Sequence, residues 1–368
     1  MNVAVIKLGA RIAISSKGTS GGTGETLSII KMLTTTGCKV DAFTKVLKKD
    51  ETPTSFSIFN IEDHFNDVTA NKYDCLIVLN GSVNFFGGAE DRAQILNYHI
   101  INHFNGKVFY ILCDPNLMLR QIWPSISVKP WSSNYKQEDI EIIRNDIIYI
   151  SQPRNIDKVK EIANKFVKIK NVIHYPFEQF PLLTTDSLDF NENPTYDLLY
   201  GGTFRGGKRE LDMIKFYFGI YDLNVTMFGK IEAKHFKPDL VNNLKHPNYE
   251  KSVPYDQFTN KMNEARATVI IGDKLYKELD DLAQRIYESI NAGNIILIDA
   301  SYDHNKLVFR NEELRKFNYV NSKDDVVYRL IKLQDDDFRR HIYDLQMKDI
   351  AFNKNDYANN FKKLLEEN

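Results

Sequence analysis

The segment Tyr200-Gly201-Gly202-Thr203-Phe204-Arg205-Gly206-Gly207-Lys208-Arg209-Glu210 lies between an apolar run, Leu198–Tyr200, and a helical pattern from Met213 to Tyr217. This order predicts a strand that ends in a glycine-rich turn at the start of a helix. Glycines let a backbone approach a bound group closely, and a helix N-terminus offers free N–H groups to an anion. Arg205 and Arg209 are spaced to share one face of a helical turn. The segment indicates a diphosphate site; the alternative is an ordinary strand–helix turn with solvated arginines.

A second segment also combines the end of an apolar run with charged residues that could bind a nucleotide. Val269–Lys274 ends an apolar run, and Tyr276, Arg285 and Glu288 follow before the next apolar run, Ile295–Asp299. Arg285 and Glu288 share a helical face because they are three residues apart. A carboxylate in this position can accept both hydroxyls of a ribose. The alternative is a surface ion pair, which is common and contributes little.

Apolar runs alternate with helical patterns along both halves of the chain. This alternation predicts two α/β halves, each with a parallel sheet whose ligand lies at the carboxyl ends of the strands. Residues 177–194 contain two prolines and no clear period, so we interpret them as a linker. The expected strands are 2–8, 40–43, 75–79, 108–112, 147–150 and 170–175 in the first half, and 196–200, 225–228, 267–271, 295–298 and 318–320 in the second.

The bulk composition is that of a globular protein with two domains. The chain has 368 residues, of which 43% are apolar and 26% charged, and its formal net charge is −1. This charge argues against a protein that coats DNA through many phosphate contacts. No apolar run has the roughly 18 residues of a membrane span, and the first residues have no signal-peptide pattern. Cys38, Cys75 and Cys113 are widely spaced, which predicts buried thiols in a reducing compartment.

Several segments match one family in order. They are Asn80–Gly88, Trp123-Pro124, Lys129-Pro130-Trp131, the arginine turn and Ile270–Glu288. On these segments the chain resembles the T-even phage DNA β-glucosyltransferases, which move glucose from UDP-glucose onto 5-hydroxymethylcytosine in duplex DNA.

The resemblance implies the GT-B architecture, with two Rossmann-like domains facing across a cleft and a last helix, about 351–365, that crosses back to the first domain. The acceptor (DNA) domain is expected at 1–177 plus about 353–368. The UDP-sugar domain is expected at 195–352, and the linker between them at 178–194.

The resemblance also implies site residues. Asp114, which follows an apolar run, matches the general base, and Glu25 matches an acidic residue near the sugar. The alternative for Asp114 is a turn cap. The residues expected to bind the UDP-sugar are Gly202, Thr203, Arg205, Arg209, Gly229, Val253, Tyr276, Arg285 and Glu288. Those expected to contact DNA are Asn84, Phe86, Lys129 and Trp131, because a phenylalanine beside glycines can support a base stack from which the target nucleotide has swung out.

The resemblance further implies a monomer in the cytoplasm of the infected bacterial host, with a UDP-sugar and duplex DNA containing 5-hydroxymethylcytosine as partners and no membrane. Mg²⁺ or Mn²⁺ is expected only near the diphosphate. We expect no metal site made by the protein itself: His99 and His103 have no third ligand, and Asp335–Asp337 opens a helix, where acidic residues favour the dipole.

One segment departs from the family. Lys17–Gly24 forms a longer glycine-rich loop without the ending of a phosphate-binding P-loop. The loop would border the sugar, so the identity of the sugar is left undecided. A pentose donor such as UDP-arabinose is an alternative to UDP-glucose. Two further alternatives are a GT-B transferase that acts on a small molecule and a DNA-binding relative without catalysis.

Overall fold

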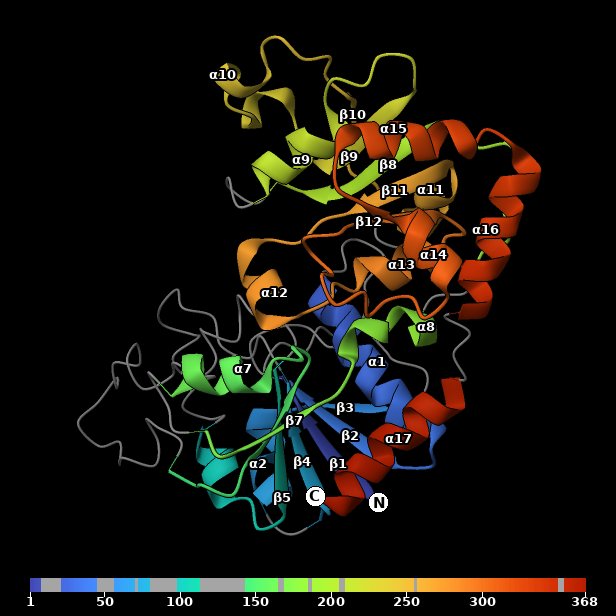
Figure 1. Cartoon of the computed structure of the whole chain (residues 1–368). Coiled ribbons are helices and arrows are strands. Elements are labelled where there is room, and N and C mark those ends of the chain that lie inside the picture. The colour runs from blue at the N-terminus through green and yellow to red at the C-terminus, as the bar shows by residue number, and fades with distance from the viewer. Residues whose placement is uncertain are drawn as a thin grey trace. The chain divides into compact units, whose positions relative to one another are not determined.

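The chain divides into two compact units, which are described separately below (Figure 1). One unit is Met1–Thr184 together with Asn353–Asn368, and the other is Thr185–Phe352. The computed structural model describes residues 1–7, 21–44, 56–69, 72–79, 98–112, 143–164, 169–184, 187–204, 209–254, 257–349 and 354–368. The first part of the expected linker is helical and belongs to the first unit.

The first unit contains a seven-stranded sheet in the order β3-β2-β1-β4-β5-β6-β7, with every described pairing parallel. Its strands are β1 (Asn2–Ile6), β2 (Lys39–Thr44), β3 (Ser57–Asn60), β4 (Cys75–Val78), β5 (Lys107–Leu112), β6 (Ile148–Ser151) and β7 (Asn171–His174). Its helices include α1 (Gly21–Thr35), α2 (Ile61–Thr69), residues 98–103, α7 (Ile156–Ala163), η1 (Phe177–Gln179), α8 (Pro181–Thr184) and α17 (Lys354–Glu367). The strand order reverses between β1 and β4, which is where open α/β sheets bind ligands.

The second unit contains a six-stranded sheet in the order β10-β9-β8-β11-β12-β13, again parallel throughout. Its strands are β8 (Tyr196–Thr203), β9 (Val225–Lys230), β10 (Asn248–Glu250), β11 (Ala265–Ile270), β12 (Ile295–Asp299) and β13 (Tyr319–Val320). Its helices are α9 (Glu210–Tyr217), η2 (Ala233–His235), α10 (Pro238–Val241), α11 (Phe258–Asn263), α12 (Lys274–Leu279), α13 (Arg285–Asn291), α14 (Glu312–Asn318), α15 (Lys323–Lys332) and α16 (Asp336–Asp349). The reversal here lies between β8 and β11.

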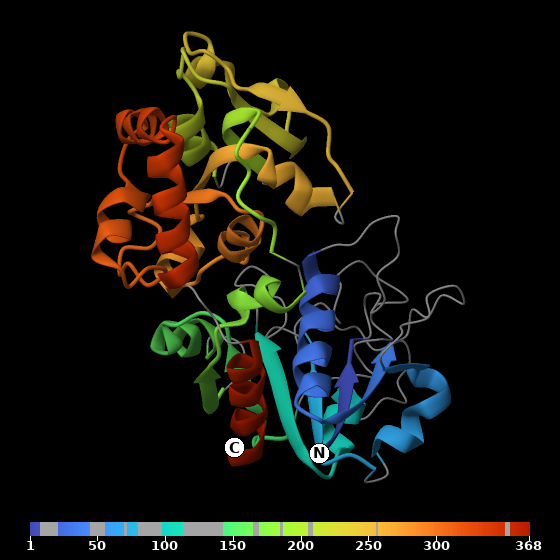
Figure 2. The same ribbon diagram turned by 90° about the vertical axis from the view of Figure 1, so that its right-hand side faces the viewer.

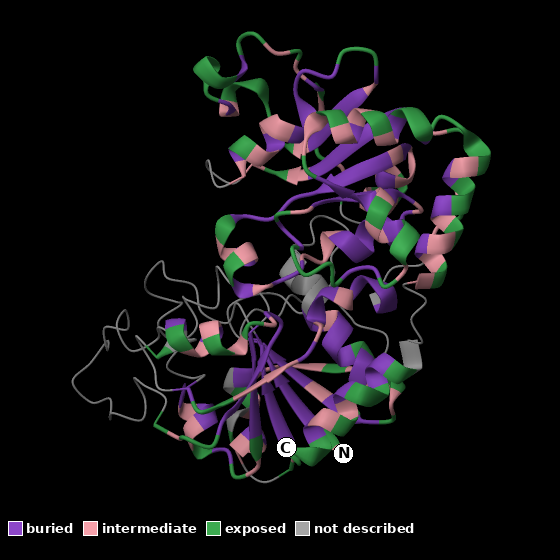
Figure 3. Ribbon diagram, viewed as in Figure 1, coloured by how far each residue is buried: buried purple, intermediate pink, exposed green. Residues whose placement is uncertain are grey.

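The predicted fold class is confirmed, and the predicted runs form all the inner strands together with the edge strands β7 and β13. The inner strands are largely buried, while the helices that cover them are exposed on their outer sides (Figure 3). Two strands were not predicted, β3 and β10. Both lie at a sheet edge and carry no fully buried residue, so they lack the apolar run that identifies an inner strand.

The last helix, α17, is part of the first unit and packs along α1 (Figure 2). Phe361 is fully buried, and Lys362 Nζ donates to the carbonyl of Thr36 at 3.2 Å. Two tyrosines tie the helix to the end of β7: Tyr175 Oη donates to the carbonyl of Tyr357 at 2.6 Å, and Tyr357 Oη donates to the carbonyl of Pro176 at 2.8 Å. The expected return of the last helix to the first domain is therefore confirmed.

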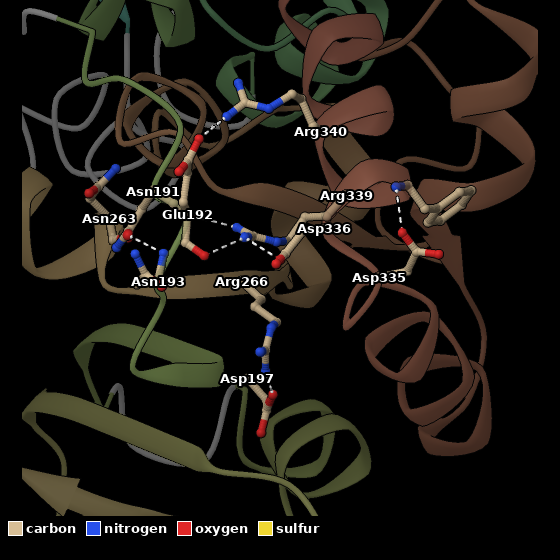
Figure 4. A network of polar contacts seen from close by, with 11 residues as sticks. Asn191, Glu192, Asn193, Asp197, Asn263, Arg266, Asp335, Asp336, Arg339 and Arg340 are labelled. Carbon is tan, nitrogen blue, oxygen red and sulfur yellow. Dashed lines mark hydrogen bonds and ion pairs between the residues drawn. The ribbon is translucent and has the colours of Figure 1, made fainter.

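A polar network fastens the start of the second unit to α16 (Figure 4). Arg339, only 2% exposed, donates to the carbonyls of Asn191 at 2.6 Å and Glu192 at 3.1 Å. The guanidinium carbons of Arg339 and Arg340 lie 4.2 Å and 4.3 Å from the centre of the Phe190 ring. The network precedes β8 in the chain, so it lies at the amino ends of the strands, opposite the edge that carries the candidate site.

Candidate nucleotide site

The carboxyl edge of the second sheet is built on close backbone contact between β8 and β9. Gly202 and Gly229 are partners in the sheet register, and Gly229 has φ +122°. A Cβ atom at Gly229 would lie 1.9 Å from the carbonyl oxygen of Gly202. A Cβ atom at Gly201 would lie 2.5 Å from the ring of Phe228 and 2.7 Å from the ring of Phe258. Gly201 and Gly202 were predicted to lie in a turn but belong to β8, and side chains do not fit at Gly201 or Gly229.

Gly229→Ala is expected to abolish UDP binding and to destabilise the protein by more than about 2 kcal/mol, because the side chain meets backbone and the residue needs a positive φ. Calorimetry with UDP and denaturant unfolding measure the two effects. Gly37→Ala is the matched control: its φ is +77°, but a Cβ atom there meets nothing within 4 Å. Gly37→Ala should retain UDP binding. Wild-type affinity in Gly229→Ala would show that the nucleotide does not approach these strand ends.

Arg209 is the half-buried N-cap residue of α9. Its guanidinium carbon is 5.5 Å from the centre of the Tyr276 ring. Burial opposes the charged form, but nearby phenolic oxygens and the Asp273 carboxylate hold the pKa of Arg209 above its usual range. Within the described part of the chain, buried Nε has no hydrogen-bond partner. A buried charged donor without a partner is costly, so the position suits an anionic ligand.

Arg285 and Glu288 lie on the first turn of α13, as their spacing predicted. Arg285 Nε and Glu288 Oε2 are 3.3 Å apart, and Glu288 is only 8% exposed, so this is not a surface ion pair. The guanidinium carbon of Arg285 lies 4.0 Å from the centre of the Phe258 ring, which borders Gly201. Among the described residues, buried Arg285 Nη1 also has no hydrogen-bond partner. Each of the two arginines thus rests on an aromatic ring and has a donor left over for a ligand.

Tyr276 and Val253 complete the described part of the site. Tyr276 is 8% exposed and lies in α12, which follows β11. Val253, half-buried, packs with Phe258 against a core cluster that includes Tyr196 and Phe228. Thr203, the last residue of β8, is exposed at the same edge.

Sequence reasoning overlooked two residues here. Asp273 caps α12: its Oδ1 accepts from the N–H groups of Leu275 at 3.1 Å and Tyr276 at 3.2 Å. An aspartate between a strand and a helical pattern is a recognisable N-cap signal. Phe258, which supports Arg285, carries no such signal, because nothing local shows that it will lie under an arginine from another helix.

Other predicted residues lie outside the described residues: Asn84, Phe86, Asp114, Lys129, Trp131 and Arg205. Asp114 comes two positions after β5, which ends at Leu112 in the middle of the first sheet. Glu25 lies in α1, where the structure describes its backbone but not its side chain.

The described residues contain no group of three or more His, Cys, Asp or Glu side chains arranged to hold a metal ion. The rings of His99 and His103 stack 4.1 Å apart, and His103 Nδ1 lies 2.9 Å from the carbonyl oxygen of His99. Asp335 Oδ1 accepts from the N–H of Phe338 at 3.0 Å at the start of α16, so the acidic run caps a helix. None of the helices in the described ranges is long and apolar enough to cross a membrane.

Two units with parallel, Rossmann-like sheets, and a last helix that returns to the first unit, define the GT-B class of glycosyltransferases. The chain belongs to the bacteriophage T4 beta-glucosyltransferase family, whose model matches residues 1–184. DNA beta-glucosyltransferase of Enterobacteria phage T4 is 30% identical over 341 residues, which cover 92% of this chain and 91% of that protein.

Solved structures agree with this assignment. T4 phage BGT in complex with its UDP-glucose substrate has a TM-score of 0.78 to this chain at 28% identity, with 99% of each chain covered. T4 phage BGT in complex with UDP and Mn²⁺ has a TM-score of 0.77 at 28% identity, again with 99% of each chain covered.

Proposed function

We propose that this protein transfers glucose from UDP-glucose to the hydroxymethyl group of 5-hydroxymethylcytosine in duplex phage DNA, with inversion at the anomeric carbon. The proposed binding of the UDP-sugar donor rests on two buried guanidinium nitrogens, Arg209 Nε and Arg285 Nη1, in the unit whose strand ends at Gly201 and Gly229 leave no room for side chains. Membership of the T4 beta-glucosyltransferase family supports DNA as the acceptor of the sugar. The modification would protect phage DNA from nucleases.

The donor would be held by its nucleotide in the second unit. Arg205, Arg209 and Arg285 would bind the diphosphate and stabilise the charge that grows on it as the bond to the sugar breaks. Glu288 would accept the ribose hydroxyls, and the backbone of Val253 would hold the uracil. Gly202, Thr203 and Gly229 would let the diphosphate approach the strand ends, with Tyr276 on the same side.

Asp114 would act as the general base in the first unit. It would take the proton of the hydroxymethyl group as that oxygen attacks the anomeric carbon from the face opposite the departing UDP, with Glu25 near the sugar. A divalent ion would add positive charge at the diphosphate. Since the described residues hold no metal cluster, phosphate oxygens and water would supply most of its ligands.

The first unit would bind DNA, and the second the UDP-sugar. The target base would swing out of the helix, with Asn84 and Phe86 supporting the gap and Lys129 and Trp131 contacting the duplex. The protein would act as a monomer in the cytoplasm of the infected host.

The test is sugar transfer to matched duplexes that differ only in carrying cytosine or 5-hydroxymethylcytosine, followed by mass spectrometry. Cytosine has no hydroxyl to deprotonate, so only the modified duplex should gain mass, and UDP-glucose should be the best donor. UDP-arabinose belongs in the same panel, because preference for it would change the sugar and leave the reaction class intact. Equal labelling of both duplexes, or of neither with any donor, would refute the DNA-transferase proposal and favour a small-molecule acceptor.

A further inference from the structure

Asp273 is a buried carboxylate at the diphosphate edge, yet none of the roles above uses it. It is 2% exposed and comes three positions after the last residue of β11, Ile270. Oδ1 accepts the two N–H groups at the start of α12, whereas buried Oδ2 has no hydrogen-bond partner among the described residues. Capping needs only one acceptor and no charge, because serine and asparagine cap as well as aspartate. The second oxygen and the negative charge therefore call for another explanation.

The same helical turn connects Asp273 to the arginine pocket. The N–H that Asp273 accepts at 3.2 Å belongs to Tyr276, whose ring lies 5.5 Å from the guanidinium carbon of Arg209. The carboxylate also contributes to holding the guanidinium of Arg209 in its charged form. Asp273 thus has two connections to Arg209, one through the aromatic ring that supports it and one through its charge.

The charges of the two nucleotides differ in a way that this carboxylate can exploit. UDP carries a terminal phosphate and is more negative than UDP-glucose, so a purely cationic pocket binds the product more tightly than the substrate. Strong product binding slows turnover, because release then limits the rate. A fixed carboxylate that caps the helix carrying Tyr276, whose ring contacts Arg209, weakens the binding of UDP more than that of UDP-glucose, because UDP is the more negative of the two.

We propose that Asp273 is a positioning residue that holds the Tyr276 ring against Arg209 through the helix cap. Its carboxylate charge also limits the affinity of the arginine pocket for UDP, so that the product leaves. The inference rests on the proposed placement of the diphosphate at Arg209.

Asp273→Asn tests it, because the amide retains an acceptor for the cap and removes the charge. UDP should bind about tenfold more tightly by calorimetry, a size typical of one nearby charge in a partly buried site. The KM for UDP-glucose and kcat should both fall, with a burst of product in the first turnover. Serine is also neutral and a good N-cap residue, so Asp273→Ser should bind UDP as tightly as Asp273→Asn. Agreement between the two variants would exclude a folding defect specific to one of them. Asp273→Ala, which removes the cap, should lose stability and bind UDP more weakly.

Two control variants distinguish a wrong diphosphate site from a wrong role for Asp273. Asp222→Asn removes an exposed carboxylate just before β9, at the opposite edge of the sheet, and should leave UDP affinity unchanged. Arg209→Ala should weaken UDP binding; if it does not, the diphosphate lies elsewhere and the proposed site fails together with this inference. If Arg209→Ala weakens binding while Asp273→Asn and Asp273→Ser bind UDP as the wild type or more weakly, Asp273 is only a helix cap and the inference is overturned.

Discussion

Asp114→Asn is expected to lower kcat by about 10²–10⁴ while UDP-glucose still binds, because loss of a general base has a cost of this size. The amide has nearly the shape of the carboxylate but cannot take the acceptor proton. Asp114 follows β5, which lies beside β4 and therefore one strand from the point where the order of the first sheet reverses. In α/β proteins, ligands bind at the carboxyl ends of strands near this reversal, so residues that follow these strand ends are well placed to react with them.

Single-turnover transfer to hydroxymethylated duplex measures this loss, and calorimetry with UDP-glucose measures binding. Asp63→Asn is a matched control, since Asp63 is an exposed aspartate on α2 in the same unit. It should transfer sugar at the wild-type rate. Turnover near wild type in Asp114→Asn would remove Asp114 from the mechanism and direct attention to Glu25.

Arg209→Ala is expected to weaken UDP binding and to slow transfer by about 10²–10³, the usual effect of removing one donor from a developing negative charge. The buried position on the Tyr276 ring makes the guanidinium hard to replace: Arg209→Lys keeps the charge but loses the planar fork and the stacking. Arg205→Ala should resemble Arg209→Ala. Glu288→Ala should mainly weaken nucleotide binding, because its proposed partner is the ribose, which does not change in the reaction.

Calorimetry with UDP and single-turnover transfer distinguish these variants. Arg340→Ala is the matched control, since Arg340 is a half-exposed arginine at the amino edge of the second sheet, paired with Glu192. It should bind UDP normally. If Arg205→Ala, Arg209→Ala and Glu288→Ala all bind UDP as the wild type does, the nucleotide does not lie at this edge.

The sequence by itself determined those features that depend on neighbours along the chain. The inner strands were predictable because a strand buried on both faces needs a continuous apolar run. The glycines after the apolar run predicted a turn, but β8 continues through Gly201 and Gly202 to Thr203, and residues 205–208 of the glycine-rich segment lie outside the described residues. The pairing of Arg285 with Glu288 follows from helical spacing alone, and the structure has it at 3.3 Å.

Only the tertiary structure decided which distant residues meet. Gly229 must be glycine because its backbone lies against Gly202 on another strand, which no local pattern records. Phe258 supports Arg285 from a different helix, and the edge strands β3 and β10 exist through pairing and not through their own apolar residues. Asp273 Oδ2, which has no hydrogen-bond partner among the described residues, was likewise recognisable only once β11, α12 and α9 were placed together. Local periodicity specifies the elements, but strand order and packing decide which buried polar groups are left for a ligand.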